Sequence, residues 1–394
     1  MFLNETHLPQ LLPASAYASP DWFERERESV LLPAWHVVTT LSEIPKPGDF
    51  VTATLLGHPL IVHNADGDPR CFINACAHRF SRLTGARRGN QCRLTCGYHG
   101  WEYDADGSTR RIPDAPSFRP LEKGRFGLVR LDTATCGGLV FVRLRPANLS
   151  LEEFLGPYRD SIAAACGTEN RQLCSWSRVV ESNWKLVVEN TLESYHVSEI
   201  HRRTLGAMPG EQACRHELHE RSSSFTAPGG VPGMAGAIQR RVLASLGKLP
   251  TRSYEHILIM PTLTLSVMDD LVIVWTFEPL DERRTQLTLR GFGVQAAHPA
   301  PVRNRLLAQW ARKHLAFWGR VWEEDVALYP LIHEGVSAPL LPGPGLLSRR
   351  EERVHHFQQW LCGQVRAGSD DVVPAPVCRS SAAAERFNPK EQLS

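Results

Sequence analysis

Residues 76–101 read CAHRFSRLTGARRGNQCRLTCGYHGW, and this stretch decides how the first part of the chain folds. It places two couples of cysteine and histidine, Cys76-Ala-His78 and Cys96-Gly-Tyr-His99, on either side of a basic loop that carries glycine. Cysteine and histidine in equal number at such short spacing are typical of a metal site. Two thiolates and two imidazoles can bind zinc tetrahedrally, or they can bind a [2Fe–2S] cluster with both histidines on one iron.

The spacing favours the cluster, with zinc as the alternative. Zinc sites usually have Cys-x2–4-Cys followed by a histidine pair, whereas here 17 residues separate His78 from Cys96. The segment resembles the Rieske cluster-binding motif of oxygenases, in which Arg follows the first histidine and Gly-Trp follows the second, as they do here. It departs from that motif at Gly97, a loop position where these proteins usually have proline. The resemblance implies that the [2Fe–2S] ligands are Cys76, His78, Cys96 and His99.

A second candidate metal site follows Asn183-Trp184-Lys185, where the sequence VVENTLESYHVSEIH places His196 and His201 five residues apart. Apolar residues recur at helical spacing over 183–200, so the two imidazoles converge only if the helix ends or distorts between them. Two imidazoles and one carboxylate form the facial triad of non-haem Fe(II) oxygenases, which leaves positions open for O2 and substrate. Taken alone, such a pair is better explained by solvated or core histidines.

This second segment resembles the catalytic-domain motif of Rieske non-haem iron oxygenases, and the resemblance spans roughly residues 36–335. Near its end, residues 322–325 (WEED) resemble the Glu-Asp motif of that family, whose Asp is the third iron ligand. The resemblance therefore implies that His196, His201 and Asp325 bind the mononuclear iron. Glu324 and Glu323 are the alternatives to Asp325, and both are also compatible with solvated charges on a helix.

Glu193 is the candidate catalytic residue. In this family a buried carboxylate links a cluster histidine of one subunit to an iron-ligand histidine of its neighbour within a three-fold ring, which implies a homotrimer. Glu193 lies three residues before His196, within reach on a helix, and its other partner is expected to be His78 or His99 of the adjacent subunit. The alternative is a surface glutamate paired with Lys185 or an arginine.

The identity of this residue also bears on the reaction. The bridging position is commonly Asp in this family, and Glu occurs in members that resemble choline, betaine and carnitine oxygenases. The glutamate at position 193 therefore favours a monooxygenase acting at C–H or N-methyl groups over a ring-dihydroxylating dioxygenase. A cationic substrate would need an aromatic cage, for which the candidates are Trp275, Phe277, Phe317 and Trp318.

Composition excludes several other classes of protein. The 394 residues carry 44 Lys and Arg against 42 Asp and Glu, a net charge of +2 that indicates no nucleic-acid or membrane partner. No apolar run approaches the length of a membrane span, and the N-terminus lacks a signal-peptide pattern. Ten scattered cysteines predict reduced thiols in a cytoplasmic protein, and Cys71 and Cys92 are expected in the core.

The pattern of the chain predicts an α+β protein in two parts. Short strands with hairpin signals at Asp66-Gly67 and Asp106-Gly107 predict an all-β Rieske domain over 36–148. Residues 1–35 and 149–394 are expected to form a catalytic domain, with a large antiparallel sheet and helices around the iron. It begins with a capping box, Ser150 with Glu153, before a helix over 151–165. Within it, 253–295 read as strands, 302–328 as a long helix, 223–236 as a loop and 367–394 as an irregular tail.

Two other clusters of cysteine and histidine have no motif partner. Cys214-Arg-His216-Glu-Leu-His219 mimics half of the cluster motif but lacks a downstream Cys-x2-His, so these residues are expected at the surface. The pair His355-His356 is expected to be solvated.

The resemblance implies the terminal oxygenase of a multi-component system that hydroxylates or N/O-demethylates a small organic substrate. Electrons would come from NAD(P)H through a separate reductase, with or without a ferredoxin, because the chain carries no GxGxxG fingerprint after a strand. A dihydroxylating dioxygenase alpha subunit is the alternative within the family. A non-catalytic Rieske electron carrier is the alternative from another class.

Overall fold

Two antiparallel sheets of seven strands each form the frame of the molecule, within the part of the chain that the structure describes. The computed structural model describes residues 2–121, 126–206, 213–229, 233–245, 250–251, 253–295, 301–341 and 345–367. The predicted irregular tail lies outside these residues apart from Ala367, which ends helix α10 (Glu352–Ala367). None of the described helices is both long and apolar enough to cross a membrane.

The first sheet has the strand order β2-β11-β10-β5-β4-β3-β6. Its strands are β2 (His36–Thr40), β3 (Asp49–Leu55), β4 (His58–Ala65), β5 (Asp68–Ile73), β6 (Arg88–Asn90), β10 (Arg130–Cys136) and β11 (Leu139–Arg143). Beyond it lies a small sheet of β7 (Leu94–Thr95), β8 (Glu102–Tyr103) and β9 (Thr109–Arg111).

The hairpin signals of the sequence are turns of these sheets. Asp66 and Gly67 join β4 to β5 with φ of 55° and 95°, the pair of positive values that a two-residue type I′ turn requires. Gly107, with φ 89°, lies in the turn between β8 and β9, where the Asp106 carboxylate accepts hydrogen bonds from Ser108. Both hairpin predictions are therefore confirmed.

The second sheet has the strand order β12-β18-β17-β16-β15-β14-β13. Its strands are β12 (Asn170–Val180), β13 (Arg215–His219), β14 (Ser222–Pro228), β15 (Ser253–Ile259), β16 (Leu263–Val267), β17 (Leu271–Pro279) and β18 (Thr285–Val294). The predicted strands in 253–295 are confirmed. The predicted loop over 223–236 is wrong, because 223–228 belong to β14, which pairs with strands on both sides, and 233–236 begin helix α7 (Gly233–Ala244).

Helices cover this second sheet and extend from it. The Ser150–Glu153 capping box starts α3 (Leu151–Leu155) as predicted, but Gly156, with φ 53°, interrupts the predicted helix before α4 (Arg159–Ala165). The remaining helices are α1 (Ser15–Ala18), α2 (Pro20–Glu26), α5 (Trp184–Thr191), α6 (Val197–Ile200), α8 (Pro301–Val326) and α9 (Tyr329–Val336). Helix α8 confirms the long helix predicted over 302–328 and packs on β18, β17 and β12.

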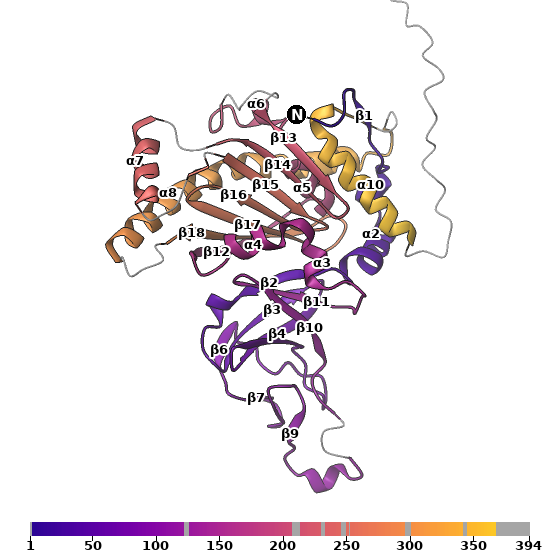
Figure 1. Ribbon diagram of the computed structural model, residues 1–394. Helices are drawn as coiled ribbons and strands as arrows, with labels where there is room; N and C mark the ends of the chain where they lie inside the picture. The colour runs from indigo at the N-terminus through magenta and orange to yellow at the C-terminus, as the bar shows by residue number, and fades with distance from the viewer. Residues whose placement is uncertain are drawn as a thin grey trace, which may run out of the picture.

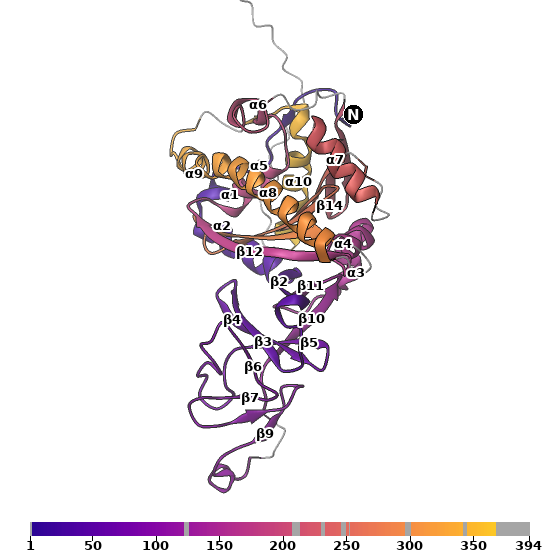
Figure 2. The same cartoon turned by 90° about the vertical axis from the view of Figure 1, so that its left-hand side faces the viewer.

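The two sheets share their hydrophobic core. One buried cluster combines Val140 of β11 with Phe277 of β17, and a second combines Phe141 of β11 with Ile257 of β15. The small sheet β7–β9 packs on the first sheet in a separate cluster that includes Phe72 of β5. It lies at the opposite end of the molecule from α6 in both views (Figures 1 and 2). The two candidate metal motifs therefore lie at opposite ends of the folded molecule, within the part of the chain that the structure describes.

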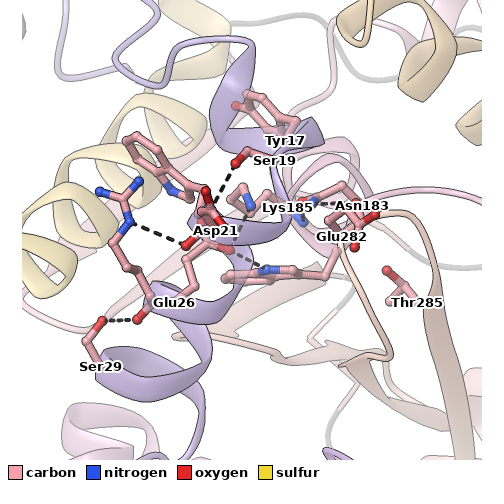
Figure 3. Close-up of polar contacts among 12 residues, drawn as sticks. Tyr17, Ser19, Asp21, Glu26, Ser29, Asn183, Lys185, Glu282 and Thr285 are labelled. Carbon is pink, nitrogen blue, oxygen red and sulfur yellow. Dashed lines mark hydrogen bonds and ion pairs between the residues drawn. The ribbon is translucent and has the colours of Figure 1, made fainter.

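The Asn-Trp-Lys motif fastens the start of α5 to two distant segments. The Asn183 side chain accepts a hydrogen bond from the Lys185 amide at 3.0 Å and donates to the Glu282 carbonyl at 2.9 Å. Trp184 Nε1 and Lys185 Nζ both donate to Glu26 Oε2, at 3.0 and 2.8 Å, and all three side chains are buried (Figure 3). Burial raises the pKa of Glu26 and lowers that of Lys185, and attraction between the opposite charges counters both shifts.

Breaking this buried ion pair should be costly for folding. We expect Lys185→Met to lower the free energy of unfolding by about 3–5 kcal/mol, because the Glu26 carboxylate then stays buried without a cation. The double variant Glu26→Gln/Lys185→Met removes both charges and should lose much less, since the introduced glutamine can still accept from Trp184. Chemical denaturation of the three proteins measures the difference. Equal losses in the single and double variants would contradict a stabilising role for the pairing.

Candidate metal centres

The four predicted cluster ligands lie on two loops of the same backbone design. In the first loop the Cys76 amide donates to the Ser81 carbonyl at 2.8 Å, and the Phe80 amide donates to the Cys76 carbonyl at 2.9 Å. The second loop repeats both bonds from Cys96, to Trp101 at 2.8 Å and from Gly100 at 3.0 Å. Phe80 and Gly100 occupy the equivalent positions and both have positive φ. The unequal spacings of the motif, Cys-x-His and Cys-x2-His, are therefore carried by two matching turns.

These loops bring the thiols and imidazoles together. The rings of His78 and His99 lie 4.6 Å apart between centroids, and His78 stacks on Trp101 at 5.1 Å. Both thiols are buried, and Cys76 Sγ lies 3.0 Å from the hydroxyl of Tyr103. His78 Nδ1 is buried and has no hydrogen-bond partner among the described residues. Two buried thiols and two adjacent imidazoles fit the donor set of a Rieske cluster.

The second predicted site is assembled from a broken helix and the end of α8. Helix α5 ends at Thr191, and the short α6 begins after His196 and ends before His201. The break therefore lies before His196, and the predicted break between the two histidines is wrong: the residues between them form α6, and the two rings still lie 5.2 Å apart between centroids. Asp325 is the penultimate residue of α8 and reaches the same point from the other side.

The three predicted iron ligands form a compact group. Candidate ligand atoms of His196, His201 and Asp325 all lie within 4.8 Å of one another. Asp325 Oδ1 is 3.5 Å from His196 Nε2 and 3.2 Å from His201 Nε2. This buried oxygen makes no hydrogen bond within the described part of the chain. A buried carboxylate oxygen without a donor, facing two imidazole nitrogens, is an arrangement that a divalent cation would satisfy.

Each of the two histidines also contacts a glutamate through its Nδ1, the ring nitrogen that does not face Asp325. Glu193 Oε1 contacts His196 Nδ1, and Glu324 Oε2 accepts from His201 Nδ1 at 2.8 Å and from Thr204 Oγ1 at 2.6 Å. Because each Nδ1 already has a carboxylate partner, the Nε2 of each ring is the nitrogen that faces Asp325 and is available to bind a metal. Burial lowers the pKa of His201, but the nearby negative charges of Asp325 and Glu324 and the hydrogen bond to Glu324 outweigh it and raise this pKa overall.

The alternatives to Asp325 have other partners. Glu323 pairs with Arg178 at 2.7 Å, and both side chains are largely exposed. Glu324 engages His201 through Nδ1, on the side of the ring away from Asp325. The structure therefore brings Asp325 into the histidine pair, and it gives Glu324 an orienting position that the sequence did not indicate. Lys185 pairs with Glu26 and not with Glu193.

A cavity of about 130 Å³ opens beside this group of side chains. It is roughly as large as the ~150 Å³ cavity that admits benzene in another protein. Three of the four predicted aromatic wall residues line it, whereas Phe317 does not. Its aromatic lining consists of Phe225, Tyr254, Trp275, Phe277, Trp318, Trp322 and Tyr329.

Some predictions about side chains outside the two sites are wrong. Cys214 and His216 are buried, and His216 Nδ1 lies 2.9 Å from Glu352, a residue far along the chain. His355 and His356 are both half-buried rather than solvated, and His355 contacts the Pro9 carbonyl. These pairings join distant segments, which local sequence patterns do not reveal.

The two thiols near the cluster motif, those of Cys71 and Cys92, differ in their exposure to solvent. Cys71 is buried as predicted, but Cys92 is exposed, because it lies in the loop between β6 and β7 that faces outward. Neither belongs to the two loops that carry the motif.

Comparison with protein families identifies both parts of the chain. The model of the Rieske [2Fe-2S] domain matches residues 34–125, and the model of the ring hydroxylating alpha subunit (catalytic domain) matches residues 169–367, half of the chain. The chain belongs to the ring-hydroxylating alpha subunits. It is the alpha subunit of a Rieske terminal oxygenase, an oxidoreductase, and the predicted fold class and cofactors are confirmed.

Relatives of this alpha subunit include both dioxygenases and monooxygenases. The alpha subunit of 2-aminobenzenesulfonate 2,3-dioxygenase from Alcaligenes sp is 26% identical over 77% of this chain and 78% of that protein. The oxygenase subunit of glycine betaine monooxygenase from Chromohalobacter salexigens is 32% identical, over 50% of this chain and 44% of that protein. A solved quaternary ammonium Rieske monooxygenase shares the fold, with a TM-score of 0.75 at 20% identity, covering 90% of this chain and 95% of that one.

Proposed function

We propose that this alpha subunit hydroxylates or N/O-demethylates a small organic substrate, with electrons supplied by an NAD(P)H-dependent reductase, either directly or through a ferredoxin. The observation that carries the proposal is the unpartnered Asp325 Oδ1 beside two imidazole nitrogens, at the wall of an aromatic cavity. In this role His196, His201 and Asp325 hold the iron, and Cys76, His78, Cys96 and His99 hold the cluster. When bound, the cluster supplies single electrons and the mononuclear iron supplies the site of O2 activation.

The side chains around the iron ligands would fix their geometry and exclude water. Glu193 and Glu324 each hold one imidazole by its Nδ1, which sets the tautomer and the direction of Nε2. The aromatic walls of the cavity would keep bulk water from the reacting atoms and hold an apolar substrate body.

The separation of the two motifs supports electron transfer between subunits. The cluster loops lie at the opposite end of the molecule from α6 (Figure 1), and Phe80 and Tyr98 on these loops are exposed. Tyr195, next to the iron-ligand candidate His196, is exposed as well. Exposed aromatic side chains at both ends suit contacts with neighbouring subunits, and we propose a homotrimer in which Glu193 links the two centres.

We further propose a division into a Rieske domain over 36–148 and a catalytic domain made of 1–35 and the residues from 149 onward. Helix α10 packs against the N-terminal residues that follow α2, which supports a place for 1–35 in the catalytic domain. The cytoplasmic location stays a prediction. A dihydroxylating activity remains the alternative reaction, because the relative with the longest alignment quoted above is a dioxygenase.

Iron analysis tests the proposal against a non-catalytic electron carrier. The anaerobically prepared protein should contain about three iron atoms and two acid-labile sulfides per chain, whereas a carrier needs about two irons. In His99→Ala we expect the sulfide and visible absorption to disappear while one iron still binds. A His99→Ala protein with full sulfide, or a wild-type protein saturated at two irons, would exclude the proposed arrangement.

A further inference from the structure

Arg353 is a buried cation that the metal sites do not explain. It lies in the first turn of α10, and only 1% of its surface is exposed. Its Nε donates to Ser223 Oγ at 3.0 Å, and its Nη1 donates to the Leu192 carbonyl at 3.4 Å. Its Nη2 lies 3.2 Å from His256 Nδ1 and also contacts the carbonyls of Ser223 and His256. All of these partners are uncharged acceptors.

No carboxylate forms an ion pair with Arg353 within the ranges that the structure describes. The neighbouring Glu352 is engaged elsewhere, with His216 and the amides of Leu3 and Asn4. Burial lowers the pKa of Arg353 to about 10, so the guanidinium still carries its charge at neutral pH. Burying a charge without a counter-charge is costly, and buried charges in proteins are normally paired. A ligand of opposite charge would supply the missing partner here.

Arg353 lines the same cavity as the iron-ligand candidates. Arg353, His256 and Ser266 contribute polar groups to the lining, together with Tyr254, whose hydroxyl lies 3.1 Å from Ser266 Oγ. Burial and the charge of Arg353 hold the pKa of His256 well below its ordinary value, so this imidazole adds no second cation. The cavity thus has aromatic walls, a metal-binding group of residues and one fixed positive charge.

We propose that the substrate is a small organic oxyanion, a carboxylate or a sulfonate, whose charged group pairs with Arg353 while its body lies between the aromatic walls. This rests on the proposed function of the same cavity. The positive charge of the guanidinium complements the negative charge of such a group, and the cavity volume limits the body to about one ring. The pairing would anchor one end of the substrate and leave the other end for the iron.

The test compares charged and neutral molecules of the same shape, with binding followed by tryptophan fluorescence and by thermal melting of the iron-loaded protein. Benzoate and benzenesulfonate are the anionic probes, and benzamide is the neutral one. We expect the wild type to bind at least one anion about 30-fold or more tightly than benzamide, with a matching rise in melting temperature. Whichever of the two anions binds more tightly shows whether the site prefers a carboxylate or a sulfonate.

Three variants test whether Arg353 is the residue that causes the preference for anions. Arg353→Met should lose the preference for the anion, Arg353→Lys should keep part of it, and Arg366→Met at the exposed end of the same helix should keep all of it. The wild-type comparison stands even if Arg353→Met fails to fold. Equal affinity of the wild type for benzoate, benzenesulfonate and benzamide, or equal weakening of all three in Arg353→Lys, would overturn the inference. With the expected iron content, that result would leave the proposed oxygenase function in place.

Discussion

Replacing Asp325 with alanine should remove the mononuclear iron and reduce turnover by more than about 100-fold, beyond the loss that an orienting partner causes. The cluster should remain and stay reducible, because its loops lie at the opposite end of the molecule from α6, which joins the two histidine ligands (Figure 1). Asp325 is the one carboxylate whose free oxygen faces both His196 Nε2 and His201 Nε2 among the described residues. Iron and sulfide analysis, with the visible spectrum before and after reduction by dithionite, measures both centres in one sample.

Two neighbouring glutamates provide matched controls on the same helix. Glu323→Ala should change neither iron content nor turnover, because its partner Arg178 lies at the surface. Glu324→Gln should weaken iron affinity about 10–100-fold without abolishing it, because it disturbs the orientation of His201 and removes no ligand. If Glu324→Ala abolished iron binding and Asp325→Ala did not, the ligand would be Glu324 and the register of the triad would be wrong.

Sequence reasoning found those features that short segments encode by themselves. The turn at Asp66-Gly67 needs two positive φ values, and the start of α3 needs a capping box, so a few residues suffice for each. The metal motifs are similar, since each keeps its histidines within a few residues of one another. The helix break was predicted between the two histidines, whereas α5 ends at Thr191, before both of them.

Features that depend on distant partners could not be found in this way. The Ser-rich β14 has weak strand propensity and forms because β13 and β15 pair with it on either side. His216 is buried because Glu352, 136 residues away, supplies its hydrogen bond. Arg353 and Glu324 likewise act through partners from other segments. Nothing in the residues beside them indicates a cavity or an imidazole.

The position of Glu193 leads to a second large effect, on electron transfer rather than on metal binding. Its carboxylate contacts His196 Nδ1 and also accepts from the amide of His196 at 3.2 Å and from that of Tyr195. Glutamine has the same size but replaces one acceptor oxygen with a donor, so one of these contacts fails in either orientation. We expect Glu193→Gln to keep nearly full iron at saturating Fe(II), because His196 Nε2, His201 and Asp325 are unchanged.

Turnover of Glu193→Gln should nevertheless fall by about 100-fold or more, the upper range for loss of such a partner. Stopped-flow absorbance should show a reduced cluster that fails to reoxidise when substrate and O2 are present. Glu199→Gln is the matched control, because Glu199 lies on the adjacent α6 and pairs with the exposed Arg202. Normal turnover in Glu193→Gln would exclude the bridging role.

Mixed assemblies separate a bridge between subunits from one within a chain. A subunit with His99→Ala lacks the cluster, and a subunit with Asp325→Ala lacks the mononuclear iron, so homotrimers of either variant should be inactive. When the two are co-expressed, the intact cluster of one subunit can face the intact iron of its neighbour, and part of the activity should return. Adding Glu193→Gln to the His99→Ala subunit, the one that keeps its iron, should abolish that recovery, whereas adding it to the Asp325→Ala subunit should not. A fully inactive mixture, or an active protein that is a monomer in solution, would mean that electrons do not pass between subunits through Glu193.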